Sequence, residues 1–259
     1  LRINGTELPH LTYTVGIDGV TVTGVTGQPT EVVIPNTLEG KSVTAIADNA
    51  FRGKTGMTRC VIPSTVTRIG NEAFCDCYVL AEFSIPAAVT EIGTAAFRNC
   101  EALPQATIPA GVTTLGANVF SGCSSLERVQ LPADLTAIGD YAFRGCARLT
   151  QVNFPAGLSS LGREAFANAC VDRPGKPLYA LPEGLTAVGV DAFRNCGAAL
   201  LVTKGGELEA LARESGNTLT YPGETDFRYR YTGAAVDGAT VYTLLLTGYA
   251  GAGGNVVIP

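Results

Sequence analysis

Eight cysteines and one histidine are the side chains of this 259-residue sequence with the greatest capacity for chemistry. Thiolate and imidazole groups bind Zn²⁺, paired thiols form disulfides, and a thiol next to an imidazole can act as a nucleophile. The cysteines, however, recur at a regular spacing. Five of them stand three residues after a phenylalanine, and Cys170 stands one residue later than that; the five are Cys77, Cys100, Cys123, Cys146 and Cys196. This spacing indicates a repeated structure in which each cysteine has the same place.

The phenylalanines themselves mark a repeat of 23 residues. Successive markers advance by 23 residues five times and then by 27, and Ile-Pro or Leu-Pro pairs advance in step with them; the markers are Phe51, Phe74, Phe97, Phe120, Phe143, Phe166 and Phe193. The cleanest unit runs from Leu126 to Cys146 and reads LERVQLPADLTAIGDYAFRGC. A period of roughly 20 to 29 residues with Leu, Val and Ile at fixed offsets is typical of a leucine-rich-repeat solenoid.

Alternation within one unit predicts its elements. Val129 and Leu131 are expected to point inward from a short strand, and Leu135–Ile138 is expected to form a second extended segment. Gly139 permits a bend, and Asp140–Phe143 is predicted to form one helical turn. The sequence therefore predicts an α/β fold, a right-handed superhelical solenoid whose coils stack in register and bring the phenylalanines and cysteines into continuous internal files.

Both ends of such a solenoid need a cap. We expect a cap over residues 1–36 with a β-hairpin around Asp18-Gly19, repeats over 37–203, and a second cap over 204–222 with a helix near 207–214 and a strand at 218–221. Residues 223–259 are predicted to be a linker and a β-hairpin unit that opens a second array, because Gly248–Pro259 parallels Gly24–Pro35. A terminal β-subdomain that shares the hairpin alone is the alternative.

Composition limits the partners. The net charge is −5 at pH 7 with no run of like charges, so neither nucleic acid nor an anionic membrane is an expected partner. No apolar stretch approaches the roughly 20 residues that a spanning helix needs. The sequence begins with Leu1, and we expect it to be a fragment of a longer product from which any signal peptide is absent.

The positions of the cysteines and of the histidine in the repeat argue against a metal site and against disulfides. A file of cysteines spreads its thiols along the axis, whereas zinc needs four ligands at one point, and the single histidine, His10, falls in the cap. Thiols that project in parallel lack disulfide geometry, so buried free cysteines are expected. Cys60 stands where valine usually packs, and Cys75 is expected to be exposed, which leaves a Cys75 crosslink open. The sequence predicts no enzyme, no metal and no cofactor.

The Ile-Pro, Ile-Gly and Ala-Phe-x-x-Cys series at a 23-residue period resembles the BspA-like, or Treponema-type, leucine-rich repeat, from about Tyr13 to Tyr221. The segment ANACVDRPGKPLYALP departs from the pattern, so the pairing of that coil is an open question. The resemblance implies a secreted or surface-anchored protein of a host-associated bacterium or protist. It also implies adhesion through binding to host matrix proteins or to other bacteria.

Solenoids bind partners through regular outward faces. The arginines that follow the phenylalanines have acidic residues nearby and are expected to form a self-neutralising surface; they are Arg52, Arg98, Arg144 and Arg194. The outward strand positions form the candidate binding face, a polar and nearly neutral set that names no ligand; they are Arg59, Glu82, Ser84, Gln105, Thr107, Arg128, Gln130, Gln151 and Asn153. A protein partner is the main expectation. A glycan-binding accessory domain of a larger surface enzyme and a structural spacer are the alternatives.

Overall fold

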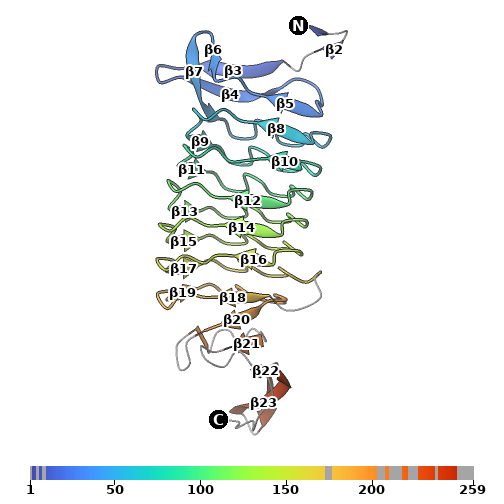
Figure 1. Ribbon diagram of the computed structural model, residues 1–259, viewed down its shortest axis with the longest axis vertical. Coiled ribbons are helices and arrows are strands. Elements are labelled where there is room, and N and C mark those ends of the chain that lie inside the picture. Colours follow the sequence, from blue (N-terminus) through green and yellow to red (C-terminus); the bar gives the residue numbers. More distant parts are fainter. Residues whose placement is uncertain are drawn as a thin grey trace.

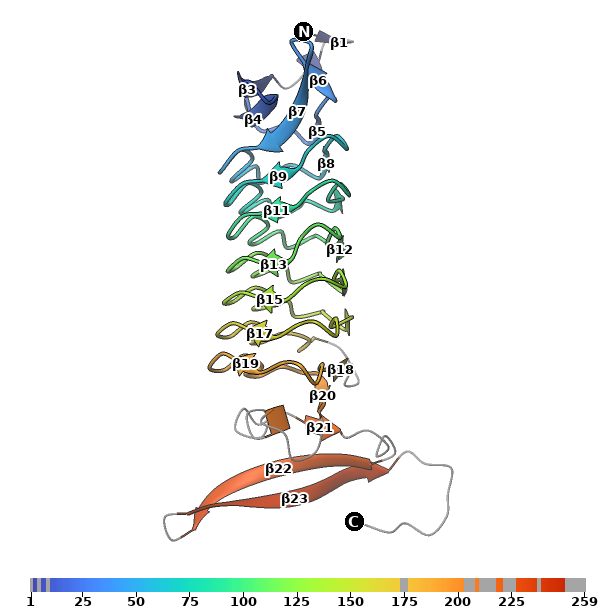
Figure 2. The same cartoon turned by 90° about the vertical axis from the view of Figure 1, so that its left-hand side faces the viewer.

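The protein is a rod of stacked coils whose two ends lie far apart (Figure 1). The computed structural model describes residues 2–3, 6–7, 10–172, 177–202, 208–209, 218–220, 227–236 and 239–249. Each coil contributes a strand to a front face, a strand to a rear face and a turn that carries the phenylalanine (Figures 1 and 2). The predicted solenoid of 23-residue repeats is confirmed.

The front strands pair in parallel, residue for residue, with the coil below. Arg128 pairs with Gln151 and Val129 with Val152, one period apart. The front strands form three successive sheets, β5–β8–β10, β12–β14–β16 and β18–β20–β21. Their bounds are β5 Glu31–Val33, β8 Arg59–Val61, β10 Glu82–Phe83, β12 Gln105–Thr107, β14 Arg128–Gln130, β16 Gln151–Val152, β18 Leu178–Ala180, β20 Ala199–Leu201 and β21 Thr218–Thr220.

The rear strands form two parallel ladders of the same kind, β7–β9–β11 and β13–β15–β17–β19. The second ladder continues across the long repeat, where Ser160 pairs with Ala187 and Leu161 with Val188. The insertion in that repeat therefore leaves the rear pairing intact, while β16 and β18 belong to different front sheets. The rear strands are β7 Lys41–Ile46, β9 Arg68–Ile69, β11 Glu91–Ile92, β13 Thr114–Leu115, β15 Ala137–Ile138, β17 Ser160–Leu161 and β19 Ala187–Val188.

The core is a file of aromatic rings along the axis. Alternation in each front strand puts one apolar side chain inside, as with Val129, which is buried between exposed Arg128 and Gln130. Behind these side chains the phenylalanine rings stack one per coil, with centroids 5.3 Å apart for Phe97 and Phe120. This spacing follows the separation of about 4.8 Å between paired strands. Seven rings share the file: Phe51, Phe74, Phe97, Phe120, Phe143, Phe166 and Phe193.

The turn that carries each phenylalanine is not helical, so the predicted helical turn at Asp140–Phe143 is wrong. Tyr141 and Gly145, two residues to either side of Phe143, have φ of 59° and 71°. A left-handed residue on each side of the phenylalanine, two positions before it and two after it, interrupts the α-helical conformation. Residues 141, 143 and 145 donate their N–H groups to the next coil, at 2.7 to 2.9 Å, instead of to their own helix.

The N-terminal end carries the expected antiparallel hairpin. β3 (Leu11–Val15) pairs with β4 (Val20–Val25), and β4 joins the rear ladder by parallel pairing with β7. β6 (Thr37–Leu38) pairs with β7, and β1 (Arg2–Ile3) pairs with β2 (Thr6–Glu7).

The C-terminal end is described in part. Of the helix expected near 207–214, only Leu208–Glu209 is described and is helical; the rest lies outside the described residues. β22 (Phe227–Val236) and β23 (Ala239–Tyr249) form an antiparallel hairpin, and Leu219 of β21 pairs with Tyr229 of β22. Across the described residues the coils consist of strands and turns, so the α component of the predicted α/β class is corrected to a β-solenoid. That residues 223–259 open a second array stays a prediction.

Candidate interaction face

The front face presents the sequence-predicted binding residues in two columns. Glu82, Gln105, Arg128 and Gln151 follow one another down the first column, below half-buried Arg59. The second column holds Ser84, Thr107, Gln130 and Asn153, all exposed. One side chain per coil in each column makes the face regular.

Several of these side chains already have partners within the rod. Arg59 forms ion pairs with Glu31 and with Glu82, the latter at 3.2 Å between Nε and Oε2. Arg128 Nε donates to Gln151 Oε1 at 2.7 Å. Such exposed pairs contribute little to stability, but they fix the positions of the charges on the face.

Asn153 serves the rod itself. Its Oδ1 accepts from the backbone N–H of Leu131 at 2.7 Å, and its Nδ2 donates to the carbonyl of Leu131 at 2.9 Å. The amide therefore satisfies both backbone groups of the neighbouring coil. Asn153 belongs to the predicted face by position, but its polar atoms are committed to Leu131.

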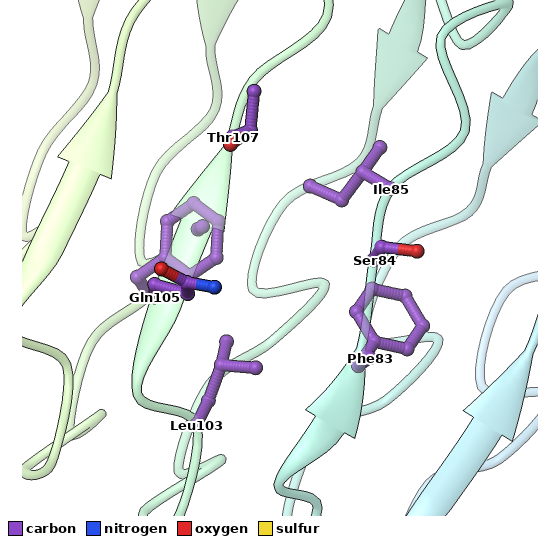
Figure 3. A pocket seen from close by; sticks show the side chains of 8 residues that line it. Phe83, Ser84, Ile85, Leu103, Gln105 and Thr107 are labelled. Carbon is purple, nitrogen blue, oxygen red and sulfur yellow. The ribbon is translucent and has the colours of Figure 1, made fainter.

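A pocket of about 90 Å³ opens on the front face between β10 and β12. Figure 3 shows Phe83, Ser84 and Ile85 on one side and Leu103, Gln105 and Thr107 on the other. Ala106 and the ring of Phe120 complete the lining. Ser84, Gln105 and Thr107 were predicted as face residues, whereas the apolar lining was not predicted as part of a site.

The pocket lies where the coils separate. Between described β10 and β12, and between β11 and β13, the strands are not paired, although the ladders resume on either side. The turns at this level stay joined, since Ala95, Phe97 and Asn99 donate their N–H groups to the next coil at 2.8 to 2.9 Å. At this level, successive coils are therefore joined by hydrogen bonds at the turns and are unpaired at the strands.

The distances around the glycines on the rear face also show that successive coils lie farther apart at this level. A Cβ on Gly93 or Gly139 would lie 2.4 or 2.8 Å from a backbone nitrogen of the coil above. A Cβ on Gly116 would lie no nearer than 3.4 Å to Thr94. Backbone-to-backbone contact is thus looser at the level of the pocket than at the levels beside it.

Pro104 accounts for the missing front pairing. The residue at its place in other coils donates its backbone N–H to the preceding coil, as Ala81 does to Thr58 and Thr150 to Glu127, both at 3.0 Å. Proline has no N–H to donate and is confined to sheet edges. Pro177 has the same place before β18, where the front face is interrupted again. This substitution of proline in the repeat is the sequence signal that marks both interruptions.

The cysteine file is buried and hydrogen-bonded. Each thiol donates to the carbonyl of the phenylalanine in the preceding coil, at 3.1 to 3.2 Å; the thiols are those of Cys77, Cys100, Cys123 and Cys146. Cys196 continues the spacing and is half-buried. None of the eight cysteines, all of which lie in the described part of the chain, forms a disulfide. The thiols therefore act as small polar groups that satisfy carbonyls inside the core.

Cys75 corrects the sequence analysis, because it is buried and not exposed. Burial raises the pKa of its thiol, against a hydrogen bond with Arg98 that lowers it. The Arg98 side chain of the next coil is long enough to cover a small residue at this position, where most coils have an arginine instead. A Cys75 crosslink is therefore disfavoured in the folded rod.

Alkaline pH will destabilise the rod through the cysteine file. Burial raises the pKa of Cys123 from 9.0 to about 12. The folded state thus favours the neutral thiol, and this stabilisation is present below pH 9 and is lost as the pH rises toward 12. We expect Cys123 alone to lower the free energy of unfolding by roughly 1 kcal/mol between pH 8 and pH 10.

Urea unfolding of the wild type and of Cys123→Ala at these two pH values measures this contribution. The free energy of unfolding of the variant should fall by roughly 1 kcal/mol less than that of the wild type over the interval. Equal losses in the two proteins would show that the Cys123 thiol does not titrate with folding.

Three of the four arginines that follow the phenylalanines, Arg52, Arg144 and Arg194, are paired with acidic residues, as expected for a self-neutralising surface. Arg52 Nη1 lies 2.6 Å from Glu72 Oε2. Glu164, which is buried, lies 2.7 Å from Arg194 Nη2 and 3.5 Å from Arg144 Nε. These contacts run between coils and leave no basic row on this side of the rod.

Neither a metal centre nor a spanning helix is found in the described part of the chain. No group of three or more His, Cys, Asp or Glu residues in this part is placed to hold a metal ion. No helix in it has the length and apolar character needed to cross a membrane.

Comparison with known proteins agrees with the coil architecture. Residues 44–171 match the BspA type leucine rich repeat region in six copies. The crystal structure of the T. pallidum leucine rich repeat protein is 29% identical, with a TM-score of 0.64 over 81% of this chain and 95% of that one. A leucine rich cell surface protein from Faecalibacterium prausnitzii A2-165 is 25% identical, with a TM-score of 0.54 over 76% of this chain and 70% of that one. A search of curated proteins gave no match.

Proposed function

We propose that this chain, which over residues 44–171 belongs to the BspA-type leucine-rich repeat family, is a protein-binding module displayed on or outside a bacterial cell, with adhesion as its role. The observation that carries the proposal is the front face, where two columns of outward side chains surround a pocket. The description of the similar F. prausnitzii protein as a cell surface protein supports the location.

Physical features of the face support a protein partner. Extended rows of outward side chains are the surface that solenoids offer to other molecules. The face holds acidic, basic and neutral side chains in close succession, so it suits a partner of mixed polarity better than a polyanion. A pocket with aromatic walls within a polar surround has the organisation of a binding hot spot.

Purified extracellular-matrix proteins and a glycan array provide the direct test. The chain is immobilised, and binding of each probe is measured by surface plasmon resonance. We expect at least one matrix protein to bind with a Kd in the micromolar range, typical of a surface of this size on one partner. Gln105→Arg should weaken that binding about tenfold or more by placing an unpaired charge at the centre of the face.

Thr114→Arg is the matched control, because Thr114 is an exposed residue of rear strand β13 at the same level of the rod. It should leave the affinity unchanged. Equal weakening by both variants would place the partner on another surface. Binding to glycans alone would favour an accessory carbohydrate-binding role, and no binding to either class would favour a structural spacer.

A further inference from the structure

We propose that the pocket between β10 and β12 is an anchor site for one bulky apolar side chain, of leucine or phenylalanine size, carried by an extended segment of a protein partner. This inference rests on the protein-binding role proposed above and assigns the residues that provide its anchor. It follows from the chemistry of the lining and from the size of the pocket. It also follows from a comparison with the second break in front-strand pairing, between β16 and β18, where the rod buries a side chain of its own.

The lining selects an apolar group. Phe83, Ile85, Leu103, Ala106 and Phe120 supply its apolar groups, and Ala106 contributes only a methyl group. Ser84, Gln105 and Thr107 add uncharged polar groups, and no charged side chain lines the pocket. Within the described part of the chain, the structure shows no side-chain hydrogen bond for these three polar residues. They can therefore bond to the backbone of an incoming segment, while the aromatic wall receives its side chain.

The volume sets the size of the occupant. At about 90 Å³ the pocket is smaller than an apolar cavity of roughly 150 Å³ that takes up benzene. A single aliphatic side chain, or the edge of one aromatic ring, is the matching object. A sugar ring with its hydroxyl groups is larger than benzene and needs more hydrogen-bonding groups than this wall offers.

The second interruption of the front face shows what such an opening accepts. Pro177 precedes β18 as Pro104 precedes β12, and the residue two positions after the proline is Tyr179 in one coil and Ala106 in the other. The Tyr179 ring is fully buried, and its hydroxyl donates to the carbonyl of Leu149 at 2.6 Å. The rod therefore fills one interruption with its own aromatic side chain.

At the first interruption no residue takes the place of that ring. Ala106 is too small, although Val129 and Val152 fill the same position in the next two coils. Phe83 packs against Phe74 and Phe97, with centroids at 4.9 and 5.1 Å, but it remains half-buried at the pocket wall. A partner's apolar side chain would cover this exposed aromatic surface as Tyr179 covers Phe166 and Phe154.

Short capped peptides test the site independently of any natural partner. Peptides of the form acetyl-Ser-Gly-X-Gly-Ser-amide, with X as Leu, Phe, Ala or Glu, are titrated into the ¹⁵N-labelled chain of 259 residues, and amide chemical shifts are followed. We expect saturable shifts at Ser84, Gln105 and Thr107 with Leu and Phe. The Ala and Glu peptides should bind with affinity at least about tenfold lower, because they bury less apolar surface.

Ala106→Tyr should fill the pocket as Tyr179 fills the second interruption, and it should abolish the shifts. Thr114→Tyr is the matched control, because it adds the same ring to an exposed position of rear strand β13, away from the front face. It should preserve the shifts. Ala106→Val copies Val129 with a smaller change, so it tests the pocket even if the tyrosine variant does not fold.

The outcomes separate this inference from the proposed function. Equal affinity for the Leu and Ala peptides, or unchanged binding by both a folded Ala106→Tyr and Ala106→Val, would overturn the anchor site. A matrix protein that binds wild type and Ala106→Tyr equally would do the same, while leaving the protein-binding role in place. Selective binding of the Leu and Phe peptides would uphold the pocket even if no protein on the matrix panel bound.

Discussion

Replacing Phe97 with alanine is expected to lower the free energy of unfolding by about 4 kcal/mol. Phe97 is fully buried, and its ring stacks between those of Phe74 and Phe120, at 5.5 and 5.3 Å between centroids. The substitution removes the apolar surface of one ring and leaves a cavity against both neighbours. Because each coil is stabilised by the coils beside it, the loss weakens two interfaces together.

Urea unfolding followed by circular dichroism measures this loss. Phe193→Ala is an informative comparison, because among the described residues its ring stacks on Phe166 alone, at 5.5 Å, and it retains slight exposure. It should lower the free energy of unfolding by less than Phe97→Ala does. Gln130→Ala, on the exposed face, should change stability by less than about 0.5 kcal/mol. A cost below about 1 kcal/mol for Phe97→Ala would contradict the assignment of the ring file as the core.

Gly93→Ala is expected to destabilise the rod by about 3 kcal/mol although it adds one methyl group. A Cβ at this position would lie 2.4 Å from the backbone nitrogen of Asn71 and 2.6 Å from the carbonyl carbon of Gly70. Both contacts are with backbone, so no side-chain rotation relieves them. The N–H of Gly93 also donates to Ile69 at 2.8 Å, and that bond would be strained as the coils move apart.

Gly56→Ala is the matched control for this prediction. A Cβ at Gly56 would meet no atom within 4 Å, and Gly56 is not among the residues with positive φ. The variant should be neutral or more stable by about 0.4 to 1 kcal/mol, through reduced freedom of the unfolded chain. Thermal unfolding of the two variants distinguishes them. Similar melting temperatures would contradict the close approach of successive coils at Gly93.

The repeat arrangement could be predicted from sequence because it depends on periodicity alone. One phenylalanine and one Ile-Pro or Leu-Pro pair per 23 residues determine which side chains fall on the same line, whatever the local backbone does. The inward place of Val129 and the outward places of Arg128 and Gln130 follow from strand alternation in the same way.

Local backbone conformation in the turns could not be read from the same pattern. Asp140–Phe143 contains residues that are acceptable in a helix, but Tyr141 has positive φ because its N–H is bonded to Arg163 in the next coil. A contact with a residue 22 positions ahead overrides the local preference. Cys75 was misjudged for a related reason, since its contact with Arg98 of the neighbouring coil exists only in the stacked structure.

The pocket depends on residues that differ from the repeat consensus. A consensus pattern taken over all coils does not show such differences. Pro104 removes one N–H from the front ladder and Ala106 supplies too little volume, so the two together are needed to open the site. At the second interruption the buried ring of Tyr179 stands two residues after Pro177, where Ala106 stands after Pro104. Deviations of single coils from the consensus therefore determine where the pocket forms.

The loss of strand pairing between β10 and β12 also bears on how the rod responds to pulling along its axis. At this level the coils are joined at the turn, as by the hydrogen bond from the N–H of Phe97 to the carbonyl of Val119, whereas at neighbouring levels strand pairing also joins them. A rod of such coils under tension along its axis would therefore separate first at this level, in the region around Phe83.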